Sequence, residues 1–235
     1  KQPDFTDEAG DLIPQKSLGV EIIASTITSS SPNTESDRSI DIKGLGGGGN
    51  VDINGIDLYT SILVSDDEIR LDGDGGSSAA EVTDGIGVSL IETDLTTDII
   101  DIQGDGSKGS STTGSSGLWI DDVTIIGINR VGIAGKAGLT TSVDGVSSAN
   151  DGISLVGGSL IQSDGPIDLD GDGGESEGGS NSSYGVWIYG ASIDSKDSIT
   201  VSGQGGEGRE VGNANGVSIS SDYDENTDTL IHLAE

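Results

Sequence analysis

The sequence has no cysteine and no methionine, and only 3% of its residues are aromatic. Without cysteine, neither a disulfide framework nor a thiolate metal site can form. Without methionine, residue 1 is not a natural translation start, so we expect a processed chain or a segment of a longer one. No apolar run approaches the roughly 20 residues of a membrane span, and residues 1–18 lack the apolar centre of a signal peptide. We therefore predict no membrane insertion.

The chain is also poor in basic residues. Ten Lys and Arg residues stand against 41 Asp and Glu, which gives a net charge of -31. This charge repels nucleic-acid phosphates and anionic lipid headgroups, so neither is an expected partner. It suits a protein that stays soluble in salt or with divalent cations, and we predict an extracellular or cell-surface location, in a bacterium.

Glycine is abundant, with 40 residues, and it marks an internal repeat. Seven glycines precede similar segments, at successive spacings of 36, 32, 30, 35, 33 and 31 residues. These anchor glycines are Gly19, Gly55, Gly87, Gly117, Gly152, Gly185 and Gly216.

Three short apolar groups follow each anchor. The first pair alternates with a period of two, as in Val20/Ile22, Ile56/Leu58, Val88/Leu90, Leu118/Ile120, Ile153/Leu155, Val186/Ile188 and Val217/Ile219. A single apolar residue comes eight positions after the glycine, at Ile27, Leu63, Leu95, Ile125, Leu160 and Ile193. A second pair closes the unit, at Ile40/Ile42, Ile69/Leu71, Ile100/Ile102, Val131/Ile133, Ile167/Leu169 and Ile199/Val201. Such alternation places the apolar side chains on one face of a short strand.

Three strands, two tight corners and one variable glycine-rich loop describe one coil of a solenoid. A single coil cannot bury its apolar face, but stacked coils share one core. The sequence therefore predicts an all-β, right-handed parallel β-helix (β-solenoid) of about seven coils, with the glycine-rich loops on one side. Residues 1–18 are expected to form an N-terminal linker or cap, and residues 19–235 a single solenoid domain whose coils start near 19, 55, 87, 117, 152, 185 and 216.

The repeat resembles a known family in three quoted stretches: Gly185-Val-Trp-Ile, Ser198-Ile-Thr-Val-Ser-Gly-Gln-Gly-Gly-Glu-Gly208 and Asn215-Gly-Val-Ser-Ile219. These are similar to the glycine-rich repeats of filamentous-haemagglutinin-like surface proteins, over roughly residues 19–219. The resemblance implies a secreted parallel β-helix with an adhesive or structural role.

One acidic stretch matches the first half of a calcium loop. Asp168, Asp170 and Asp172 alternate along one strand, and Glu175 or Glu177 could complete a Ca²⁺ site, since hard cations need several converging oxygens. The alternative is a ladder of opposite charges in neighbouring coils. Aligning the coils puts Arg70 between Asp41 and Asp101, Lys43 beside Asp72, and Lys136 between Asp105 and Asp172.

Four aromatic residues form a second candidate surface. Trp119 and Trp187 both lie two positions after an anchor glycine and should point outward, with Tyr184 and Tyr189 nearby. Exposed rings could stack on surface glycans or on a neighbouring fibre. Alternatively, a glycine-rich loop covers this face and buries the indoles.

The expected function is an extracellular structural or adhesive segment of a surface protein or filament. Its expected partners are neighbouring repeats or identical subunits, end to end, and surface glycans. Polysaccharide-binding or polysaccharide-degrading β-helices and phage fibre segments are the alternatives. We expect no enzymatic activity, because the aspartates recur at equivalent positions, whereas a catalytic site breaks the repeat at one place.

Overall fold

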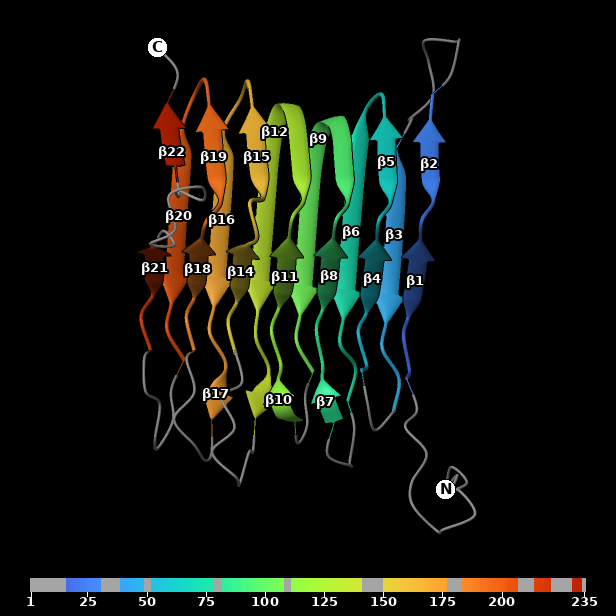
Figure 1. The fold of residues 1–235 in the computed structure, drawn as a ribbon, viewed down its shortest axis with the longest axis vertical. Coiled ribbons are helices and arrows are strands. Elements are labelled where there is room, and N and C mark those ends of the chain that lie inside the picture. Colours follow the sequence, from blue (N-terminus) through green and yellow to red (C-terminus); the bar gives the residue numbers. More distant parts are fainter. Residues whose placement is uncertain are drawn as a thin grey trace.

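The computed structural model describes residues 16–30, 39–48, 52–77, 82–107, 111–140, 150–176, 183–206, 214–220 and 230–233. Within these ranges the chain has no helix, and so none that could cross a membrane. Every strand pairs in parallel with its equivalent in the next coil, so the predicted all-β parallel β-solenoid is confirmed (Figure 1). Residues 1–15 of the expected N-terminal cap lie outside the described ranges.

The strands that follow the anchor glycines form a seven-stranded sheet, and each marks one rung of the solenoid. Rungs 1 to 7 are β1 (Val20–Ile23), β4 (Ile56–Tyr59), β8 (Val88–Ile91), β11 (Leu118–Asp121), β14 (Ile153–Val156), β18 (Val186–Tyr189) and β21 (Val217–Ser220). Their pairing has the predicted register, for example Leu118 opposite Val88 and Ile153.

The other two strands of each coil belong to an eleven-stranded sheet. The second position holds β2 (Thr26–Ser29), β5 (Ile62–Ser65), β15 (Leu160–Ser163), β19 (Ser192–Ser195) and β22 (Leu230–Leu233). The third holds β3 (Ile40–Leu45), β6 (Glu68–Asp74), β16 (Ile167–Asp172) and β20 (Ile199–Gln204). Strands β9 (Asp94–Asp105) and β12 (Thr124–Lys136) run through both positions. Two short pairs lie beyond the third strands: β7 (Val82–Asp84) with β10 (Ser111–Gly114), and β13 (Leu139–Thr140) with β17 (Glu175–Ser176).

The core is one continuous column of inward Ile, Leu and Val side chains. In rungs 2 to 6 the first pair is fully buried, whereas Val20 and Ile22 of rung 1 are half-buried and Val217 and Ile219 of rung 7 are exposed. The solenoid therefore has about five turns with an enclosed core, slightly fewer than the seven expected. A terminal rung has a neighbour on one side only, which leaves its core face open.

One predicted core residue is wrong by one position. Ile161, not Leu160, pairs with Ile125 and Ile193 and is buried, while Leu160 is only half-buried. The cause is an extra residue at the preceding corner. Rung 5 turns through Gly157 and Gly158, with φ of 68° and 79°, where other rungs use a single residue with positive φ.

The anchor glycines lie where the two sheets meet backbone to backbone. A second row of glycines faces them from the third strands: Gly44, Gly73, Gly104, Gly135, Gly171 and Gly203. A Cβ atom on Gly135 would lie 2.0 Å from the carbonyl oxygen of Gly152, and one on Gly171 would lie 2.0 Å from that of Gly185. No side chain fits at such a distance. We call this double row the glycine seam.

Beyond the glycine seam the interior is mostly polar, although Ile53 is fully buried there in rung 2. Side chains of Ser107, Ser115, Asn150, Asp151 and Ser183 are fully buried there. Hydrogen bonds between main chains join the two walls: the amides of Gly138, Gly174 and Gly206 donate to the carbonyls of Ser115 (2.7 Å), Asn150 (2.9 Å) and Ser183 (2.9 Å). The seam therefore separates an apolar core from a narrow polar zipper.

Candidate functional site

The charge ladder lies on the outer face of the third strands. Arg70 stands opposite both Asp41 and Asp101, as aligned from the sequence. Lys43 stands opposite Asp72, with 3.7 Å between Nζ and Oδ2. Lys136 stands between Asp105 and Asp172 in the next rungs. Opposite charges at this spacing stabilise a sheet by roughly 0.2–1 kcal/mol per pair.

The predicted calcium ligands lie on the outer face of β16, where Asp168, Asp170 and Asp172 alternate with buried residues. Each has another neighbour. Asp168 lies 3.9 Å from Nε of Arg130, Asp170 accepts a hydrogen bond from the Ser202 hydroxyl (2.6 Å), and Asp172 stands opposite Lys136.

Glu175 begins β17, and Glu177 lies outside the described ranges. Among the described residues no three His, Cys, Asp or Glu side chains are grouped closely enough to hold a metal ion. A Ca²⁺ site therefore remains a prediction that depends on Glu177.

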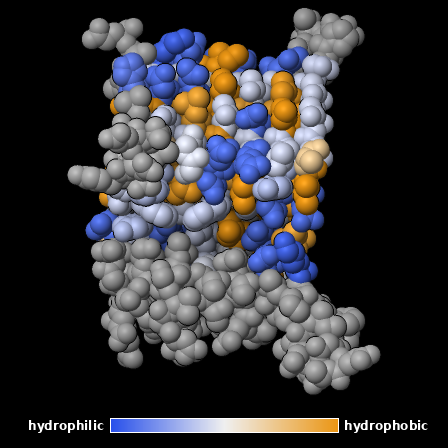
Figure 2. All heavy atoms as spheres, viewed as in Figure 1, coloured by the Kyte–Doolittle hydropathy of each residue, from blue (hydrophilic) through white to orange (hydrophobic). Residues whose placement is uncertain are grey.

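The four aromatic side chains lie on the outer face of the seven-stranded sheet. Trp119 and Trp187 are half-buried and stand two rungs apart, on either side of Ser154. The Trp187 ring centroid is 6.1 Å from that of Tyr184 and 5.8 Å from that of Tyr189. These three rings form an aromatic cluster on rung 6, while Trp119 stands apart on rung 4. On the face of the solenoid that Figure 2 shows, apolar and polar side chains are intermixed.

A buried carboxyl group, which the sequence analysis missed, lies beside this face. Asp151 accepts hydrogen bonds from the Tyr184 amide and the Ser154 hydroxyl, both at 2.9 Å. Burial raises its pKa to about 6, against the lowering effect of these two donors. In rung 2 the side-chain oxygen of Asn54 likewise accepts a hydrogen bond from an amide of the next rung, that of Ile86, at 3.1 Å. The signal in the sequence is an Asn or Asp directly before an anchor glycine.

Replacing Asp151 with asparagine should therefore change how stability depends on pH. The folded-state pKa lies above the unfolded value of roughly 3.9, so the stability due to Asp151 is present below pH 4 and is lost as pH rises through about 6. The free energy of unfolding of Asp151→Asn, relative to the wild type, should rise by about 2 kcal/mol between pH 4 and pH 8.

Urea unfolding at both pH values measures this difference. Asn54→Ala, which removes the equivalent acceptor of rung 2 but no titratable group, is the matched control and should lose the same stability at both pH values. A relative stability of Asp151→Asn that does not change with pH would contradict the prediction.

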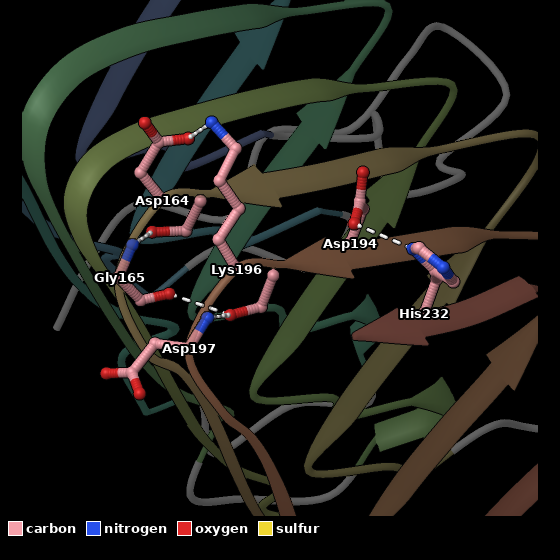
Figure 3. Close-up of polar contacts among 8 residues, drawn as sticks. Asp164, Gly165, Asp194, Lys196, Asp197 and His232 are labelled. Carbon is pink, nitrogen blue, oxygen red and sulfur yellow. Dashed lines mark hydrogen bonds and ion pairs between the residues drawn. The ribbon is translucent and has the colours of Figure 1, made fainter. Parts of the chain in front are cut away.

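A second polar cluster lies at the corner between the second and third strands (Figure 3). Lys196 forms an ion pair with Asp164 at 2.5 Å, and the Ser195 hydroxyl donates to the Gly165 carbonyl at 2.8 Å. Apart from this corner, on the second strands β19 and β22, His232 lies 3.3 Å from Asp194 in the adjacent rung. These contacts join neighbouring rungs, so we assign them to the solenoid rather than to a site.

Rung 4 departs from the repeat on the outer face of the third strands. Its outward residues are Gly132, Ala134 and Lys136, where the adjacent rungs carry Asp101, Gln103 and Asp105, and Asp168, Asp170 and Asp172. Two hollows, of about 270 Å³ and 440 Å³, open there, and both are lined by Asp105, Lys136 and Asp172. We call the two together the rung-4 groove.

No known protein family matches the sequence, and neither a curated protein nor a solved structure was found to be similar to it.

Proposed function

We propose that the chain is an extracellular structural or adhesive segment of a β-solenoid surface protein or filament. One observation carries this proposal: rung 7 is open. Its core-facing side chains Val217, Ile219 and Ile231 are 36%, 49% and 38% exposed. The equivalent side chains of rung 6, which are Val186, Ile188 and Ile193, are fully buried.

An open rung favours a further rung on top of it. Among the described strands none pairs with the outer edge of β21 or β22. Natural solenoids cover such an end or continue into another repeat. The next rung can belong to the same protein or to a second copy of this chain. The resemblance of the repeat to filamentous-haemagglutinin-like surface proteins supports the same proposal.

The proposal is non-enzymatic. On the described third strands, the outward carboxylates mostly occupy equivalent positions in successive rungs and alternate with basic residues. A structural repeat produces this regularity, since it stabilises every rung in the same way.

Copies of the chain should associate end to end as the salt or Ca²⁺ concentration rises. At low ionic strength the net charge of -31 opposes stacking, and added cations screen it. Light scattering over a salt series should show monomers growing into longer assemblies. Ile219→Asp should prevent growth because it places a charge on the open core face, whereas Ser220→Asp, on the outer face, should assemble like the wild type.

A protein that stays monomeric at every salt concentration would contradict association of copies. Continuation of the rungs within a longer chain would then be the remaining way to cover rung 7.

Glycan adhesion through the aromatic cluster is a second candidate function. Trp187 lies between Tyr184 and Tyr189 in a partly exposed group, and such rings combine a flat apolar face with a polar edge. If a sugar ring stacks on Trp187, the wild type should bind the glycan and Trp187→Ser should not.

A further inference from the structure

The rung-4 groove is the place where this repeat is broken. The last outward residue of each third strand pairs with its equivalent in the next rung, so these residues form a column. In rungs 2 to 6 the column consists of Asp74, Asp105, Lys136, Asp172 and Gln204. Only rung 4 has a basic residue in this set. The two columns before it hold Gly132 and Ala134 in rung 4, between rungs with longer side chains. Glycine is not required at residue 132, because a Cβ atom there would first meet only the mobile end of the Arg130 side chain.

The groove runs along rung 4, across the stack. On rung 4 its lining begins at Ala134; Arg130 lies outside it, with its guanidinium over Gly132 and toward Asp168. Ala134 is exposed on the floor, and Lys136 stands in the middle, shared by both hollows. Leu139 lies at the far end, in the larger hollow, together with glycines of the adjacent rungs. The site is therefore long, shallow and open.

The chemistry of the walls selects the ligand. Asp105, Asp170 and Asp172 accept hydrogen bonds, Lys136 donates, and Gln103 does both. Carboxylates outnumber basic groups, so an anionic chain is repelled. The carboxylates attract a cationic chain as well, but such a chain has no acceptor for the central Lys136 ammonium group. An uncharged chain of hydroxyl groups can both donate to the carboxylates and accept from the ammonium group.

We propose that the rung-4 groove binds a neutral glycan, whose chain lies along rung 4 between Ala134 and Leu139. The proposal deepens the adhesive half of the proposed function, on which it rests, and it assigns a site on a different sheet from the aromatic cluster. The rigid strands of the solenoid position the polar groups before the ligand arrives, which lowers the entropic cost of binding.

Titration of the whole chain with neutral hexasaccharides tests the proposal. The probes are cellohexaose, laminarihexaose, maltohexaose and mannohexaose, each followed by amide chemical shifts and calorimetry in EDTA. At least one should bind with a Kd below about 10 mM and shift the amides of Ala134, Gly138 and Leu139. Hexagalacturonate, an acidic chain, should bind at least tenfold more weakly.

Two variants locate the site. Ala134→Tyr fills the groove without changing its charge, and Lys136→Met removes the central ammonium group; each should weaken binding at least tenfold. Thr200→Tyr adds the same bulk on the outer face of a third strand two rungs away, outside the lining of the groove, and should bind like the wild type. A cooperative thermal unfolding transition in each of the three variants shows that they remain folded.

The groove is refuted if no neutral hexasaccharide binds, if the acidic chain binds equally well, or if Ala134→Tyr and Lys136→Met both retain wild-type affinity. Binding that is lost in Trp187→Ser and kept in Ala134→Tyr would overturn the groove and leave adhesion through the aromatic cluster standing. Loss in Ala134→Tyr with no change in Trp187→Ser is the expected result.

Discussion

Replacing Ile120 with aspartate should lower the free energy of unfolding of the solenoid by more than about 4 kcal/mol. We expect no other single substitution on rung 4 to have a larger effect. Ile120 is fully buried and stacks between Leu90 and Leu155, which are also fully buried. A carboxylate there would have only aliphatic neighbours on both sides. Because each rung is stabilised by the rungs next to it, the loss should spread along the stack.

Trp119→Ser is the matched control, one residue away on the same strand. The indole is on the outer face and half-buried, so its loss should cost less than half as much as Ile120→Asp. Urea unfolding followed by circular dichroism compares the two. Equal destabilisation by the two substitutions would show that the Trp119 indole is covered and packs in a second core. It would contradict the half-exposed position of this side chain on the outer face.

Replacing Gly135 with alanine should destabilise the solenoid by about 3 kcal/mol or more. The added Cβ atom would lie 2.0 Å from the Gly152 carbonyl oxygen and 2.7 Å from a methyl carbon of Leu118. The oxygen belongs to the main chain of the opposite sheet, so relief requires the two sheets to separate at the glycine seam. Alanine normally stabilises a strand relative to glycine, so a large loss points to the seam itself.

Gly132→Ala, on the same strand, provides the comparison. Its Cβ atom would meet Nη2 of Arg130 at 2.8 Å, and a long side chain can move away. We expect a change within about 0.5 kcal/mol in thermal or urea unfolding. Similar losses in both variants would contradict a specific role of the glycine seam.

The register of the strands could be predicted from the sequence because the apolar pairs alternate with a period of two. A slip of one residue would turn a whole strand inside out, so pairs such as Leu118/Ile120 and Ile153/Leu155 have only one favourable alignment. The same alignment fixed the charge ladder, including Lys136 between Asp105 and Asp172.

The alignment assigned the wrong inward residue in the second strand of rung 5, where only one apolar position per coil was used to align the strands. Leu160 and Ile161 are both apolar, and nothing in the composition says which points inward. The corner before them decides, because Gly157 and Gly158 both adopt positive φ and add one residue to the turn. Turn length depends on backbone geometry that glycine leaves open.

The sequence by itself determined the solenoid, its register and the outer charge ladder, since these follow from spacing and alternation within each coil. Only the tertiary structure decided what lies between coils and between sheets. It showed that the anchor glycines face a second glycine row, that Asp151 is buried under Ser154 and the Tyr184 amide, and that rung 4 forms a groove. The glycine contacts and the Tyr184–Asp151 hydrogen bond join residues about 11 to 33 positions apart, which the hydrophobic pattern of a single coil does not contain.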